Sequence, residues 1–152
     1  MTSLRERWRR FASLVRAAFA ERATPGRVAA AIGLGVLLGM SPLLGLQMIL
    51  AAVLSSALKL NRVLTVLGTN VTFGPLLPAA IAAELKIGTK LMGRPLPDLS
   101  TAHLVESARD AAAAWWLGFA ALGIPLAAVL AGAAFLYARR MVNRRPSEPA
   151  ND

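Results

Sequence analysis

Met40-Ser41-Pro42-Leu43-Leu44-Gly45 interrupts a run of 31 residues, 28–58, that carries no ionisable side chain. An unbroken helix of this length would extend about 46 Å, beyond the ~30 Å hydrocarbon core of a bilayer, whereas two full spans need about 40 residues. Proline lacks a backbone N–H and clashes with the preceding turn, so we expect helix breaks at Pro42 and Gly45. The run predicts a short hairpin or a re-entrant loop with arms over 28–41 and 43–58. A single kinked, tilted helix is the alternative.

A similar interruption occurs in the next uncharged run, 63–83. This run contains Gly68-Thr69-Asn70 and Gly74-Pro75-Leu76-Leu77-Pro78, so we expect a second broken helix with its breaks at Gly74 and Pro75. Paired interruptions of hydrophobic segments indicate a membrane binding site, because broken helices expose backbone dipoles at depth. Chance repetition in a leucine-rich chain explains the two Pro-Leu-Leu matches equally well.

The third uncharged run, 111–138, predicts one C-terminal transmembrane helix over 111–140. Trp115 and Trp116 lie near its start, and Tyr137 precedes Arg139 and Arg140 at its end. Aromatic residues at both interfaces and a cationic stop are typical of a membrane span. Pro125 predicts a kink.

The composition agrees with a membrane protein. Of the 152 residues, 56% are hydrophobic and 16% are charged, and the mean hydropathy is +0.55. Soluble domains are usually about 45–50% apolar and about 25% charged. A soluble domain, a disordered chain and a disulfide scaffold are all disfavoured, the last because the chain has no cysteine. We expect an all-α membrane protein.

The positive charge flanks the uncharged runs. Residues 1–27 hold seven arginines against two glutamates, residues 139–152 hold four arginines against two acids, and the charges of 84–110 cancel. This asymmetry predicts a multi-pass protein of the inner (plasma) membrane with both termini in the cytoplasm. Nucleic acid is not an expected partner, because no basic surface with interleaved aromatic residues lies outside the ends.

The chain divides into five expected segments. Apolar residues recur at helical spacing in 1–23 opposite several arginines, which predicts a basic amphipathic interfacial helix on anionic lipids of the cytoplasmic face. Packing of this helix on a protein is the alternative. Residues 24–93 form the membrane core with its broken helices, 94–110 an outer loop and short helix, and 111–140 the last span. Residues 141–152 form a disordered tail.

A few polar side chains interrupt the apolar segments. Gln47, Asn70, Thr72 and Glu84 form a candidate polar site at membrane depth, where such groups usually face protein or a cavity. The structural alternative is that Gln47, Asn70 and Thr72 bond carbonyl groups freed at the breaks. We expect Glu84 at the outer interface, ionised and solvated, with proton or cation coupling as its functional alternative.

Other residues suggest contacts with lipid or between helices. Lys59 and Arg62 are candidate contacts to lipid phosphate, or simply anchor the inner turn by snorkelling. Gly35 and Gly39 have the spacing that lets two helices approach closely, within the chain or between protomers of a homo-oligomer.

The stretch 24–93 resembles the bacterial membrane family called domain of unknown function two thousand and sixty-two (DUF2062). The resemblance rests on Pro25, Gly33-Leu34-Gly35, Gly39, Ser41-Pro42-Leu43-Leu44-Gly45-Leu46-Gln47, Leu60-Asn61-Arg62 and Gly68-Thr69-Asn70-Val71. Such proteins typically have Asn-Pro after the Gly-Thr element, where this chain has Phe73-Gly74-Pro75. The resemblance implies a small multi-pass inner-membrane protein. Relatives are sometimes joined to envelope glycosyltransferase domains, which implies lipid-linked sugar metabolism.

We expect no enzyme activity, cofactor or metal, because the sequence shows no plausible nucleophile–base pair, zinc spacing or phosphate loop. Two classes of function remain. One is a small transporter or lipid-handling protein of envelope metabolism. The other is a non-catalytic membrane anchor or scaffold, or an accessory subunit of an envelope enzyme complex.

Overall fold

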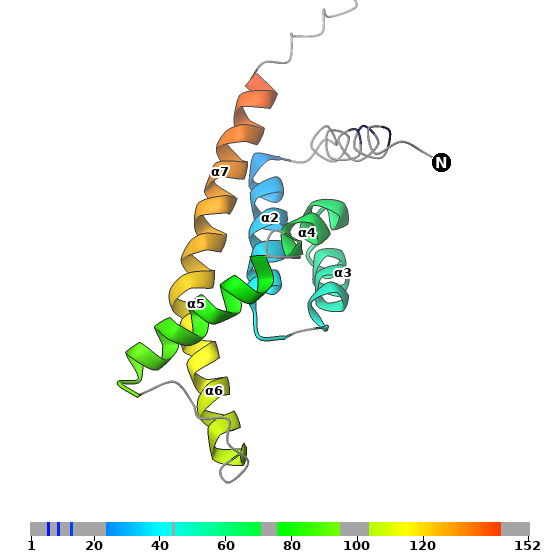
Figure 1. Cartoon of the computed structure of the whole chain (residues 1–152). Coiled ribbons are helices and arrows are strands. Elements are labelled where there is room, and N and C mark those ends of the chain that lie inside the picture. The colour runs from blue at the N-terminus through cyan, green and yellow to red at the C-terminus, as the bar shows by residue number, and fades with distance from the viewer. Residues whose placement is uncertain are drawn as a thin grey trace, which may run out of the picture.

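The computed structural model describes residues 6, 9, 13, 24–43, 45–70, 76–94 and 104–143, and these ranges contain helices and no strand. The expected all-α class is therefore confirmed. The elements are α2 (Pro25–Met40), α3 (Gln47–Ala57), α4 (Arg62–Thr69), α5 (Leu76–Leu91), α6 (Leu104–Gly118), the π-helical segment η2 (Phe119–Gly123) and α7 (Ile124–Asn143) (Figure 1).

The first uncharged run is not one helix. α2 ends at Met40, and Ser41 has an extended backbone with φ −66° and ψ 149°, the conformation favoured before a proline. Gly45 has φ +86°, which allows the chain to turn before α3 begins at Gln47. With 16 and 11 residues, α2 and α3 are about 24 and 17 Å long, and neither alone reaches across a ~30 Å core.

A tight turn connects α3 to α4. Lys59 has φ +53°, and the N–H of Leu60 donates to the carbonyl of Ser55 at 2.7 Å, which closes the end of α3. Asn61 then caps α4, since its side chain accepts a hydrogen bond from the N–H of Leu64 at 3.1 Å. Figure 1 shows α2, α3 and α4 as neighbouring short helices.

The second uncharged run is also two helices. α4 ends at Thr69 after eight residues, and α5 begins at Leu76. α5 continues beyond the uncharged run, through 84–91. It ends at a left-handed Gly93, where the N–H of Arg94 donates to the carbonyl of Thr89 at 3.1 Å.

The longest helical stretch combines α6, η2 and α7. Among the described residues, Ser107–Asn143 is the one helix that is long and apolar enough to cross a membrane, with 37 residues. It is longer at both ends than the expected 111–140 span. Where a kink was expected, the π segment η2 immediately precedes Ile124-Pro125, and the N–H of Ile124 donates to the carbonyl of Phe119. A widened turn accommodates Pro125, which has no N–H to donate.

Two helix groups make up the described protein. α2 packs against α4 and α7, while α5 packs chiefly against α6. One buried cluster joins the start of α2, the start of α4 and the end of α7, and consists of Val28, Ala31, Leu64, Ala134 and Ala138. A second joins the end of α2 to η2 and α7, and consists of Val36, Met40, Phe119 and Ala127. The seam between the groups therefore runs beside the end of α2 and η2.

Several expected elements lie outside the described residues. In 1–23 only Glu6, Arg9 and Ser13 are described, and these three are helical and exposed. Thr72, Gly74 and Pro75, most of the 94–110 segment before Leu104, and the tail after Asn143 are also outside. The segment boundaries of the sequence analysis stay predictions.

Candidate functional site

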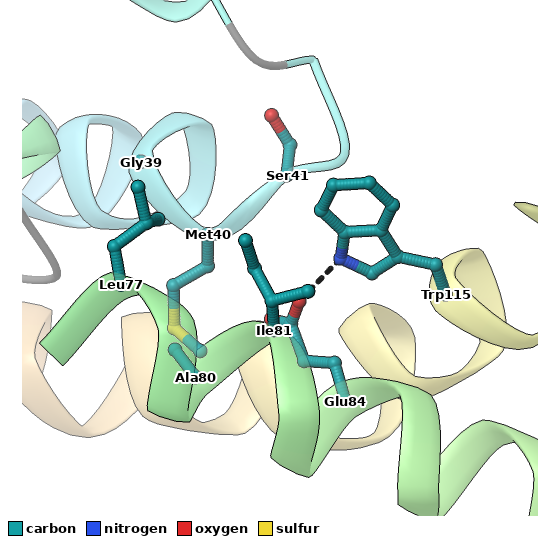
Figure 2. Close-up of a pocket in the computed structure, with 8 residues that line it drawn as sticks. All are labelled: Gly39, Met40, Ser41, Leu77, Ala80, Ile81, Glu84 and Trp115. Carbon is teal, nitrogen blue, oxygen red and sulfur yellow. Dashed lines mark hydrogen bonds between the residues drawn. The ribbon is translucent and has the colours of Figure 1, made fainter.

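A small cavity lies at the seam between the two helix groups, with a volume of about 10 Å³. That is close to the space that one water molecule needs. Its lining comes from the end of α2, from α5 and from α6: Gly39, Met40, Ser41, Leu77, Ala80, Ile81, Glu84 and Trp115 (Figure 2). Ser41 lies at the first helix break, and Leu77 lies in the first turn of the helix that follows the second. The first interruption and the first half of α5 therefore meet at one cavity.

Close contact between α5 and α6 positions the cavity wall. A Cβ atom added to Gly88 would collide with the Ala114 carbonyl, and one added to Gly118 would collide with the carbonyl of Glu84. Both obstacles are backbone atoms, so only glycine fits at these two points. Small residues on both helices thus bring their backbones together, and this crossing places the Glu84 side chain beside Trp115.

Among the described residues of the cavity wall, only Glu84 carries a carboxyl group. Its Oε2 accepts a hydrogen bond of 2.7 Å from Trp115 Nε1, and the residue is 1% exposed (Figure 2). Its Oε1 is buried and has no hydrogen-bond partner in the described part of the chain. The expectation that Glu84 is solvated is wrong, whereas its depth in the membrane stays a prediction. The helix continues past Glu84 to Leu91, so this residue lies in the middle of α5, on the face packed against α6.

Ser41 and Gln47 flank the first break from its two sides. The Ser41 hydroxyl donates to the carbonyl of Leu38 at 2.7 Å, which satisfies one of the carbonyl groups left free at the end of α2. Gln47 is 4% exposed at the start of α3, and its Oε1 has no hydrogen-bond partner. Gln47 does not line the cavity. The structure therefore separates it from Glu84.

Asn70 lies at the end of α4 and is exposed. Its Nδ2 donates to the carbonyl of Val66 at 2.7 Å, which is the role expected of a polar side chain beside freed carbonyl groups. Asn70 does not reach the cavity either. The candidate polar site of the sequence analysis is thus not one cluster: Glu84 lines the cavity, Gln47 and Asn70 lie elsewhere, and Thr72 is outside the described residues.

Gly35 and Gly39 act within the chain. A Cβ on Gly35 would lie 2.8 Å from Cα of Gly68, and one on Gly39 would lie 2.5 Å from the carbonyl oxygen of Thr69. Both contacts are to the backbone of α4. Gly35 and Gly39 therefore allow close helix approach within the chain and not between protomers. The face of α2 that carries them is covered by α4 and is not available to a second protomer.

Lys59 and Arg62 are exposed at the turn between α3 and α4. The first buried cluster places this turn, the start of α2 and the end of α7 at the same end of the molecule. Arg27, Arg139 and Arg140 are exposed there too. We call these five basic residues the cationic end. Within the described residues, the one salt bridge is elsewhere, between Arg94 Nη1 and Asp110 Oδ2 at 2.8 Å.

The residues present suit no metal centre that the described chain could build alone. No group of three or more His, Cys, Asp or Glu side chains lies together in the described part of the chain. The cavity instead offers one carboxyl group, one hydroxyl group and one indole N–H. This set can hold a proton and a water molecule.

Sequence reasoning missed Trp115, Ser41, Gly88 and Gly118. Trp115 was interpreted as an interfacial aromatic residue, although its N–H is bonded to a carboxyl 31 positions earlier. The available signal was a polar side chain followed by a glycine on each of two apolar segments. Gly88 follows Glu84 by four residues, and Gly118 follows Trp115 by three. In a chain rich in glycine and alanine this spacing does not stand out.

Comparison with known proteins identifies one family. The family described as "uncharacterized protein conserved in bacteria (DUF2062)" matches residues 8–147. No curated protein and no solved structure matches the chain.

Proposed function

The chain belongs to the bacterial family DUF2062, and on that premise we propose that it is a small multi-pass inner-membrane protein that moves a small solute or lipid through the bilayer. The observation that carries the proposal is that the end of α2, at the first helix interruption, and the first half of α5 enclose one cavity with a buried carboxyl group. Broken helices that meet at membrane depth are typical of transporter binding sites.

Exposed apolar surface supports a membrane location. In the most apolar window of Ser107–Asn143, only 22% of the residues are buried, whereas the core helix of a soluble protein is mostly buried. The short helix α3 also exposes Met48, Ile49 and Val53. Hydrocarbon is the solvent that accepts such surface without cost.

The cationic end supports one orientation. Arg27, Lys59, Arg62, Arg139 and Arg140 gather where α2 begins and α7 ends. Basic residues at one end of a membrane protein favour the cytoplasmic face, where they attract anionic lipid headgroups. In this orientation Lys59 and Arg62 contact lipid phosphate, and both termini are cytoplasmic.

The depth of the first break supports a role in transport. Met40 packs at the level of Gly123, which lies twelve residues after Ala111 and fifteen before Ala138. At ~1.5 Å per residue, these distances are about 18 and 22 Å along the helix. If the uncharged run 111–138 spans the bilayer, the break at Ser41 lies within the hydrocarbon core, between the levels of Gly123 and Trp115. α2 and α3 then form a re-entrant hairpin that enters from the cytoplasmic side and returns to it.

Cysteine labelling tests the topology, because the natural chain has no cysteine. Single cysteines replace Ser3, Leu60, Ser100 and Ser147 in turn, and intact cells are treated with a membrane-impermeant thiol reagent. Labelling at position 100 alone is expected. Labelling at position 3 or 147 in intact cells would refute the multi-pass arrangement with cytoplasmic termini.

A matched pair of serines tests the solute path. Ser41 and Ser55 are both buried, and the hydroxyl of each donates to the carbonyl three residues earlier. Ser41 lines the cavity and Ser55 does not. With a small hydrophilic thiol reagent, Ser41→Cys should react at least several-fold faster than Ser55→Cys. Equal protection of both cysteines would exclude a water-filled path and leave the anchor or scaffold as the function.

A further inference from the structure

Glu84 Oε1 is a buried acceptor without a hydrogen-bond partner among the described residues, in a cavity with space for about one water molecule. The other oxygen of the carboxyl group already accepts from Trp115 Nε1. A buried carboxylate with one hydrogen bond costs several kcal/mol unless its charge is compensated. The unpartnered oxygen therefore needs either a proton of its own or a bound cation.

The described surroundings supply no compensating charge. α2 has no ionisable residue after Arg27, and η2 has none. On α6, Asp110 is exposed and bonded to Arg94, and Arg109 is exposed. On α5 itself, Lys86 and Lys90 are exposed, and Lys86 lies two positions from Glu84, on another side of the helix. No described ionisable group thus faces the Glu84 carboxyl.

A proton fits the cavity better than a metal ion does. Hard cations such as Ca²⁺ and Mg²⁺ take six or more oxygen ligands. Among the described residues that line the cavity, the side chains offer the Glu84 carboxyl group and the Ser41 hydroxyl, and the other side chains are apolar apart from Trp115. A proton needs no further ligand. Protonation forms an O–H bond on Oε1, uses a proton delivered by hydronium, releases water and removes the charge.

We propose that Glu84 is a proton-binding site that controls the seam between the two helix groups. This inference rests on the proposed function and names the ion that the same cavity takes. With Oε1 protonated, the seam stays closed around a neutral side chain. After the proton leaves, the carboxylate requires water, so the end of α2 separates from α5 and Ser41 becomes accessible.

The helix segment beside the cavity has the geometry of a hinge. η2 connects α6, which packs against α5, to α7, which packs against α2. π-helical turns are often found at functional sites, because their widened turn is easily rearranged. A small rotation at η2 moves α5 and α6 together, so it opens the seam without breaking either packed group.

Infrared difference spectroscopy of the purified full-length protein tests proton binding. Spectra are compared between about pH 6 and pH 9, where exposed Asp and Glu side chains stay ionised. A protonated-carboxyl band that disappears at the higher pH is expected in the natural protein. Glu84→Gln should lack this band, and the control Asp110→Asn, which removes an exposed carboxyl, should keep it.

Two further infrared measurements keep the test valid if Glu84→Gln misfolds or if Na⁺ competes for the site. Trp115→Phe keeps the carboxyl group but removes its donor, so the band should remain and move to higher frequency. Replacing Na⁺ by choline should leave the titration unchanged. No band in the natural protein, a band that survives Glu84→Gln, or a titration displaced by Na⁺ would overturn the proton site.

Labelling at Ser41→Cys tests control of the seam. Its labelling rate should increase with pH beyond the intrinsic increase of a thiol. The reference for that intrinsic increase is Asn143→Cys, at the exposed end of α7. Glu84→Gln should abolish the excess. If the excess pH dependence of Ser41→Cys labelling were unchanged by Glu84→Gln, the inference that Glu84 controls the seam would be overturned. The solute path would still stand, because Ser41→Cys would still react. Failure of the topology test would instead remove the proposed function, whatever the infrared band shows.

Discussion

Gly39→Ala is expected to destabilise the protein by forcing α2 away from α4. The added Cβ would lie 2.5 Å from the carbonyl oxygen of Thr69 and 2.8 Å from its Cα, whereas ordinary contact begins at 3.4 Å. The obstacles are backbone atoms and cannot rotate away. The helices must therefore separate by about 0.9 Å, the difference between 3.4 and 2.5 Å. Overpacking of this kind typically costs about 1–3 kcal/mol.

Thermal unfolding in detergent, followed by size-exclusion chromatography of the protein that remains folded, measures this effect. For a chain of this size, about 1–3 kcal/mol corresponds to a midpoint lowered by roughly 2–12 °C. Gly26→Ala is the matched control, because Gly26 lies on the same helix and nothing is within 4 Å of an added Cβ. Its midpoint should be unchanged or slightly higher, since alanine favours helix over glycine.

Equal midpoints for Gly39→Ala and Gly26→Ala would refute the reasoning. They would mean that α2 and α4 do not approach each other as closely as the described backbone requires. Gly68→Ala gives an independent check from the other helix, because its Cβ would lie 2.8 Å from the Ile32 carbonyl oxygen. It should lower the midpoint in the same direction.

Two further predictions use the same unfolding measurement. Asn61→Ala removes the side-chain acceptor of the Leu64 N–H and should lower the free energy of unfolding by about 1 kcal/mol. Asn61→Asp keeps an acceptor and should lower it little. Equal losses of stability in both variants would show that the cap does not stabilise α4. Arg94→Ala breaks an ion pair whose side chains are 58% and 45% exposed, so it should cost no more than about 1 kcal/mol, and a larger loss would mean that the pair holds α5 to α6.

The described helix ends could largely be read from local chemistry. Pro42 has no N–H, so α2 could not continue through it, and Gly45 supplies the backbone conformation that few other residues adopt. Gly35 and Gly39 were recognisable as a small-residue face, but their spacing does not say which helix occupies it. The structure selects α4, whose Gly68 and Thr69 leave room for the approach.

Glu84 is the residue that sequence reasoning placed wrongly. Its place at the end of an uncharged run suggested a solvated position at the outer interface, because the sequence shows the charge of each residue but not what packs against it. Whether a carboxyl group is buried depends instead on what packs against its helix. Here Gly88 and Gly118 allow α5 and α6 to approach until the side chain is enclosed. That contact joins residues about 30 positions apart.

The amino-acid sequence alone determined the helical class, the interruption at Pro42 and the long apolar helix, because these depend on each residue's own backbone chemistry and on uncharged stretches. Tertiary structure alone decided that the end of α2 and the first half of α5 meet at one cavity, that Glu84 is buried there and that Trp115 is its partner. The physical reason is that helix crossings arise from matched small residues on distant segments. In a chain with many glycines and alanines, only the packed helices show which of those residues meet.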